Sequence, residues 1–174
     1  MARYVGIDPS TKTGIVVLDE VGDVWERVEI EKGGKDPARM YSLIETVMEY
    51  LCDGDIVAIE GFGFASQTGF LLGGIGWGIR MEMYRRGIQY HEVAPAALKK
   101  FCGCKGNAKK DELGVEIYKR WGFEHKSDNV RDAYVLAQVA RALHEPVPLI
   151  QAQKEVIRVI ENPPAKKSKK KKGA

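Results

Sequence analysis

Four acidic residues are spaced so that they could share a metal ion or face a phosphate. Asp8 and Glu60 each end a short apolar segment, and Asp128 and Asp132 lie four residues apart. A charge at the end of a buried strand must be paired, hydrogen-bonded or bound to a metal, because burying it alone is costly. Carboxylate oxygens suit the hard cations Mg²⁺ and Mn²⁺. Two such ions held close together can drive hydrolysis of a phosphodiester.

The segment GIDPSTKTG around Asp8 also fits a second chemistry. The first phosphate loop of actin-like ATPases likewise follows an aspartate at a strand end, usually with glycines. Here no glycine stands between Asp8 and Gly14, and no second phosphate loop or adenosine-binding segment is recognisable. We therefore expect no nucleotide cofactor, although the position of Asp8 alone does not separate a phosphate loop from a metal loop.

The elements that must position these acids follow from the hydrophobic pattern. Residues 3–7, 14–20 and 23–30 read as strands of an antiparallel meander, and the wholly apolar 55–60 reads as a buried central strand. A fifth strand is expected at 88–93. Helical patterns cover 36–51, 67–86, 95–101, 108–121, 129–143 and 149–160. This order predicts an α/β fold, a mixed sheet with helices on its faces.

The acids come from three separate parts of that arrangement. If the strands ending at Asp8 and Glu60 are neighbours, both side chains emerge at one edge of the sheet. Asp128 and Asp132, at i and i+4 in SDNVRDAYVLA, would share one face of a helix. Three segments thus offer carboxylates that could converge on one site.

Length and charge indicate one domain with a basic tail. The 174 residues are enough for one sizeable core, which we place in residues 1–161, and residues 162–174 are predicted to be a disordered Lys-rich tail. The tail carries six lysines, so the rest of the chain has a net charge of −3 against +3 for the whole. Such an arm would attract phosphate backbones, or serve as a solubilising or localisation segment.

Neither a membrane span nor a secretion signal is recognisable. No run of about 18 uncharged apolar residues occurs, and no charged-then-apolar leader is present. We expect a cytoplasmic protein. The three cysteines, Cys52, Cys102 and Cys104, lack zinc-site spacing and are expected to be reduced.

Five ordered motifs resemble the RuvC family of Holliday-junction resolvases, which have a ribonuclease H-like fold. They extend over roughly residues 1–143 and read GIDPSTKTG, VAIEGF, VAPAALKKF, GNAKKDE and SDNVRDAYVLA. The resemblance implies a mixed five-stranded sheet, with a three-stranded antiparallel meander plus two parallel strands. It also implies a magnesium-dependent endodeoxyribonuclease that acts as a homodimer and nicks opposed strands of a four-way junction.

By position, Asp8, Glu60 and Asp132 match the acidic metal ligands of that family, which implies Mg²⁺, with Mn²⁺ as a substitute and two ions per site. The fourth ligand is predicted to be Asp128, with Asn129 as an alternative ligand or as a residue that orients the site. The less favoured alternative is that Ser127-Asp128 is simply a helix start, where an acid is favoured without any metal.

Other residues are candidates for contacts with branched DNA. Phe62 or Phe64 could stack on unpaired bases, or could belong to the core. The glycines Gly69, Gly73 and Gly76 leave one helical stripe bare, for close packing on the sheet or on a second subunit. The lysines expected to contact the DNA backbone, unless they are simply solvated, are Lys12, Lys105, Lys109 and Lys110.

We thus expect a structure-selective DNA endonuclease that resolves four-way and related branched junctions by metal-dependent phosphodiester hydrolysis. The alternatives are an actin-like-class ATPase and an RNA-processing nuclease of the same fold.

Overall fold

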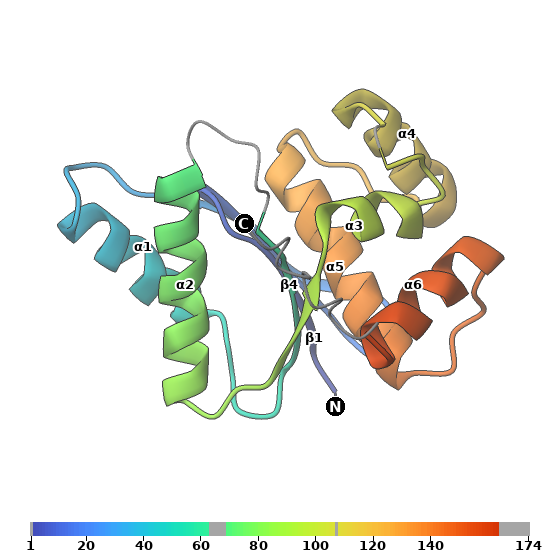
Figure 1. Ribbon diagram of the computed structural model, residues 1–174, viewed down its shortest axis with the longest axis horizontal. Coiled ribbons are helices and arrows are strands. Elements are labelled where there is room, and N and C mark those ends of the chain that lie inside the picture. The colour runs from blue at the N-terminus through green and yellow to red at the C-terminus, as the bar shows by residue number, and fades with distance from the viewer. Residues whose placement is uncertain (1, 63–68, 107, 164–174) are drawn as a thin grey trace, which may run out of the picture.

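A mixed sheet lies between two layers of helices in the computed structural model (Figure 1), which describes residues 2–62, 69–106 and 108–163. Its strands follow the order β3-β2-β1-β4-β5. The strands are β1 (Tyr4–Asp8), β2 (Lys12–Leu18), β3 (Val24–Glu31), β4 (Ile56–Glu60) and β5 (Tyr90–Val93). The helices are α1 (Ala38–Glu49), α2 (Gly69–Arg85), α3 (Pro95–Phe101), α4 (Lys110–Trp121), α5 (Asp128–His144) and α6 (Gln151–Glu161).

The strand directions confirm the predicted fold class. β1, β2 and β3 form the antiparallel meander, while β4 runs parallel to β1 and β5 runs parallel to β4. The predicted helices are found within a few residues of their expected bounds. The helix expected at 108–121 begins only at Lys110. The tail predicted for 162–174 lies outside the described residues, apart from Asn162 and Pro163.

Successive side chains of the strands point to opposite faces of the sheet and pack into two separate hydrophobic cores. Val5 and Ile7 of β1 face α1 and α2, whereas Tyr4 faces the layer built by α3, α4, α5 and α6. Figure 1 shows the two layers on opposite sides of the sheet, with α5 lying along it. No helix of the described residues is both long and apolar enough to cross a membrane.

Two glycines let α5 approach the sheet closely. A Cβ atom on Gly6 of β1 would lie 1.9 Å from the carbonyl oxygen of Ala133, and one on Gly14 of β2 would lie 2.1 Å from that of Asn129. Any other residue at these positions would collide with the backbone of α5. The first two turns of α5 therefore rest directly on the β1–β2 hairpin, next to Asp8.

Glycines also shape the contact between α1 and α2. A Cβ atom on Gly78 would lie 2.2 Å from Cδ1 of Ile44, and one on Gly74 would lie 3.1 Å from Cε of Met40, both residues of α1. In contrast, Gly69 and Gly73 of the predicted bare stripe face open space. The close packing predicted for this stripe is found within the protomer only at Gly76, which lies against Phe62.

Candidate active site

Asp8 and Glu60 lie side by side at the same end of two parallel strands. Ile7 of β1 pairs with Ile59 of β4, so the next residue of each strand is an acid. Asp8 shares the α5-facing side of β1 with Gly6, and Glu60 shares that side of β4 with Ala58, a member of the α5-side core. Asp8 is a charged residue type, yet its side chain is only 6% exposed. The predicted meeting of these two carboxylates at one edge is thus what the fold produces.

Burial makes both carboxyl groups reluctant to ionise. Desolvation, followed by the negative charges of Glu60 and Asp132, raises the pKa of Asp8 well above its ordinary value. Burial also raises the pKa of Glu60, against the opposing effects of a hydrogen bond from Asp8 and the charge of Lys110. Both carboxyl groups are thus harder to ionise than in water, chiefly because of burial. Two carboxylates so close together titrate as a coupled pair.

Asp132 of α5 completes a group of three acids. Burial, then the charge of Glu60, raises the pKa of Asp132 to about 7. Lys110 and Arg131 act in the opposite direction. The carboxylates of β1, β4 and α5 therefore interact strongly, because the close seat of α5 on Gly6 and Gly14 carries Asp132 down to the strand ends.

This donor set fits a hard divalent cation. Asp8 is buried and Glu60 and Asp132 are half-buried, and the raised pKa values of all three indicate too little positive charge around them. Oxygen-only ligands favour Mg²⁺ or Mn²⁺. As the side chains stand, the described part of the chain holds no group of three or more His, Cys, Asp or Glu residues arranged to hold an ion. The three carboxylates would have to turn toward a common centre on binding, which their shared edge permits.

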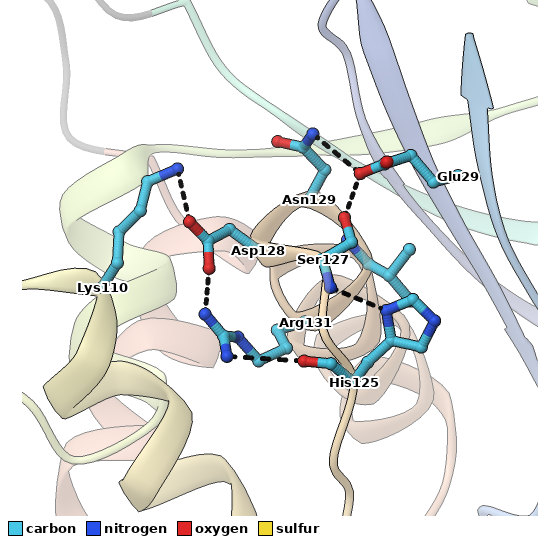
Figure 2. Close-up of polar contacts among 8 residues, drawn as sticks. Glu29, Lys110, His125, Ser127, Asp128, Asn129 and Arg131 are labelled. Carbon is cyan, nitrogen blue, oxygen red and sulfur yellow. Dashed lines mark hydrogen bonds and ion pairs between the residues drawn. The ribbon is translucent and has the colours of Figure 1, made fainter.

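Asp128 lies at the same end of α5 but is engaged by cations of the protein (Figure 2). Its Oδ2 atom is 3.1 Å from Nζ of Lys110, and its Oδ1 atom accepts from Arg131. Ser127 caps the helix by accepting the N–H of Val130 at 3.3 Å, so the helix start predicted at Ser127-Asp128 is found. Asp128 nevertheless contributes to the raised pKa of Asp132, which places it beside the group of three.

Asn129 turns the other way, toward Glu29 of β3. Its Nδ2 atom donates to Oε2 of Glu29 at 3.3 Å, and the Ser127 hydroxyl donates to the same oxygen (Figure 2). Sequence reasoning missed Glu29. The strand register could have identified it, because Glu29 pairs with Gly14, and Gly14 pairs with Asp8. The bare Gly14 lets Glu29 reach the start of α5 across β2.

The four lysines predicted to contact DNA differ in exposure and in their partners. Burial lowers the pKa of Lys110, but the hydrogen bond to Asp128 and the charges of Asp128, Asp132 and Asp8 outweigh it and raise that pKa. Lys105 and Lys109 are exposed and lie just before α4. Lys12 forms an ion pair of 3.1 Å with Glu31, on β2 and β3 respectively. Of the four predicted DNA contacts, Lys110 thus lies nearest to the acids.

Phe62 follows β4 and is half-buried against α2. Its ring stacks on Trp77 with 5.3 Å between centroids and lies 4.4 Å from the guanidinium carbon of Arg80. A ring held in this way belongs to the packing of the segment after β4 against α2. Phe64, the other aromatic candidate, lies outside the described residues.

An antiparallel meander joined to two parallel strands, with acids at the ends of the two central strands and on the covering helix, defines a ribonuclease H-like α/β fold. Among solved structures, Thermus thermophilus RuvC matches with a TM-score of 0.64 and 21% identity, over 76% of this chain and 89% of that one. The same protein in complex with a Holliday junction substrate matches with a TM-score of 0.61 and 17% identity, over 79% and 91%. No protein-family model and no curated protein matches the sequence. The chain has a RuvC-like fold.

Proposed function

We propose that the protein is a structure-selective DNA endonuclease that resolves four-way and related branched junctions as a homodimer. The observation that carries the proposal is the placement of Asp8 and Glu60 at the ends of two paired strands of a RuvC-like fold, close enough to Asp132 for the charges of these acids to help raise the pKa values of both aspartates. One of the similar structures is a complex with a Holliday junction substrate, which supports branched DNA as the substrate class.

Asp8, Glu60 and Asp132 would hold Mg²⁺, with Mn²⁺ as a substitute and two ions per site. Bound there, the ions supply an activated water and stabilise the leaving oxygen of a phosphodiester. The protein's own part is to hold the carboxylates close together, where their raised pKa values favour a cation beside them. Asp128, already paired with Lys110 and Arg131, would become a fourth ligand only by leaving those partners.

The basic residues next to the acids would hold the phosphate backbone. Lys105 and Lys109 are exposed beside the start of α4, where the N–H groups of the first turn and nearby ammonium groups favour an anion. Lys110 is held by Asp128 in the free protein and could exchange that partner for a phosphate. Phe62, which packs against Trp77 and Arg80 in the free protein, would have to leave one of these partners to offer a ring face for base stacking.

A homodimer is supported by an apolar stripe on α2. Phe70, Trp77, Met81 and Tyr84 are large, exposed and spaced so that they lie along one side of the helix. Two of these residues, Phe70 and Trp77, also line an apolar groove of about 730 Å³, together with Met40 of α1. Exposed apolar surface of this extent is typical of a protein interface.

A single cleavage assay tests the proposal. The protein is incubated with labelled four-way junction, linear duplex, flap, RNA and ATP, in Mg²⁺ or in EDTA. We expect paired nicks in the four-way junction that require Mg²⁺. Cleavage of RNA alone, or release of phosphate from ATP without nicking, would contradict the proposal and favour the other two function classes.

Variants of the three acids test the site within the same assay. Asp8→Asn, Glu60→Gln and Asp132→Asn remove a ligand charge without changing shape, so each should abolish nicking and leave junction binding in EDTA within about threefold of wild type. The matched control is Asp111→Asn, an exposed acid in the first turn of α4. A fully active Asp8→Asn protein would refute the assignment.

A further inference from the structure

A buried arginine on the opposite face of the sheet holds the end of β4. Arg80 of α2 is 2% exposed, and its guanidinium donates to the carbonyl oxygen of Glu60 at 2.9 Å. Neither the sequence pattern nor the metal-ligand assignment uses this residue. A buried charge needs several partners, and those of Arg80 all belong to the surroundings of Glu60.

The remaining donors of Arg80 fix three neighbouring segments. Nε and Nη2 donate to Oε2 of Glu92 on β5, at 3.2 and 2.9 Å. Nη1 donates to the carbonyl oxygen of Gly76, one turn earlier in α2, at 3.0 Å. The face of the guanidinium covers the ring of Phe62. One planar group therefore ties α2, β5 and the segment after β4 to the backbone of Glu60, in a fork geometry that lysine cannot reproduce.

The peptide that follows Glu60 is held from both sides. Its carbonyl oxygen accepts from Arg80, and its N–H, that of Gly61, donates to the carbonyl oxygen of Val93 at 2.8 Å. Pro9, which follows Asp8, lines a small cavity of about 60 Å³ together with Glu60, Phe62 and Arg80. The two strand ends that carry Asp8 and Glu60 thus meet directly above this arginine.

We infer that Arg80 is the positioning residue of the Glu60 carboxylate and, through it, of the metal site. The inference rests on the proposed function, because it takes Glu60 to be a metal ligand. Arg80 fixes the last peptide of β4, from which the Glu60 side chain departs toward α5. Without it, the exit of β4 and the ring of Phe62 lose their shared anchor, and the carboxylate loses its place beside Asp8. Residues that orient ligands in this way commonly change metal affinity or activity by about 10- to 100-fold.

The test measures Mn²⁺ binding to the free protein by electron paramagnetic resonance, beside thermal stability and Mg²⁺-dependent nicking. We expect Arg80→Gln to weaken Mn²⁺ binding by about tenfold or more. Arg80→Lys, which keeps the charge but not the fork, should fall between wild type and Arg80→Gln. The matched control is Met83→Leu, a fully buried residue one turn further along α2, which should change Mn²⁺ binding by less than about twofold.

A second route covers the case in which Arg80→Gln does not fold. Glu92 is half-exposed, so Glu92→Gln removes the charged partner of Arg80 at little cost to the core, and it should weaken Mn²⁺ binding in the same direction. Mn²⁺ affinities of the Arg80 and Glu92 variants equal to that of Met83→Leu would overturn the role of Arg80 while leaving the proposed function intact. A wild-type protein that neither binds Mn²⁺ nor nicks junctions would overturn both.

Discussion

At the scale of single residues, the three acids of the site are stabilised poorly by the protein alone. Asp8 and Asp132 have raised pKa values because they are buried near one another and near Glu60. The nearest cation, Lys110, is shared with Asp128. A site built in this way costs stability when it is ionised and empty, and it gains most from a divalent cation.

The pH dependence of folding should reveal this cost. A carboxyl whose pKa is raised on folding binds more protons in the native than in the unfolded state between its ordinary pKa and its raised one. For Asp132, with a native pKa of about 7, stability should therefore fall as pH rises from about 4 to about 7. In EDTA we expect Asp132→Asn to flatten the fall in Tm over this window and to be more stable than wild type at pH 8. A wild-type Tm that rises relative to the variant across that window would contradict this environment.

Two substitutions at the start of α5 distinguish the two candidates for the proposed fourth metal ligand, Asp128 and Asn129. Asp128 faces Lys110 and Arg131, whereas Asn129 faces Glu29 (Figure 2). If Asp128 binds metal, Asp128→Asn should reduce nicking by at least about 100-fold and Asn129→Ala by less than about tenfold. The measurement is the single-turnover nicking rate as a function of Mg²⁺. Loss of activity in Asn129→Ala alone would assign the role to the other offset.

Sequence reasoning found the acids because each ends an apolar segment or shares a helical face. It could not find Glu29, Arg80 or the ion pairs of Asp128. Their roles depend on which strands are neighbours and on which side chains meet across them. The pairing of Glu29 with Gly14, for example, places an exposed residue of an outer strand beside α5. Such contacts between distant segments leave no local pattern.

At the scale of elements, the site depends on how closely α5 rests on the sheet. The meander was predicted from apolar runs and turns, and the structure confirms it. The close approach was not predicted, because Gly6 and Gly14 read as ordinary strand and turn glycines until the helix above them is known.

Gly6→Ala should displace α5. The added methyl would lie 1.9 Å from a carbonyl oxygen of the helix backbone, which cannot turn away like a side chain. Overpacking usually costs about 1–3 kcal/mol, and we expect at least the upper end here. Equilibrium denaturation measures the change, with Gly33→Ala as the matched control, because nothing lies within 4 Å of a Cβ there. That control should stay within about 0.5 kcal/mol of wild type. Equal stabilities of the two variants would contradict the close seat of α5.

At the scale of the whole molecule, the two helix layers differ in what they contribute. One layer contains α5, which covers the acids, and the other contains the exposed apolar stripe of α2. α5 covers the site on one face, while Phe70 and Trp77 of α2 stand out from the other. If two copies join through α2, as proposed, the α5 side of each protomer lies on the opposite face of its sheet from the interface.

The proposed dimer can be tested by placing a charged side chain in its predicted interface. Phe70 is 97% exposed, so Phe70→Glu should leave the protomer folded and place a charge in the interface. We expect light scattering after size exclusion to give a dimer for wild type and a monomer for Phe70→Glu at micromolar concentration. Trp25→Glu, at a half-exposed tryptophan of β3, is the matched control and should remain dimeric. A Phe70→Glu dimer as stable as wild type would remove this face from the interface.

The seat of α5 has a consequence for the protein's synthesis. β1, β2 and β4 leave the ribosome well before the helix that covers them, since α5 begins only at Asp128. Until then the α5 side of the sheet lacks its cover and Asp8 and Glu60 lack Asp132. Contacts of such long sequence separation form late. If the protein is the proposed nuclease, the nascent chain should therefore be unable to cut nucleic acid until α5 has closed over the strands.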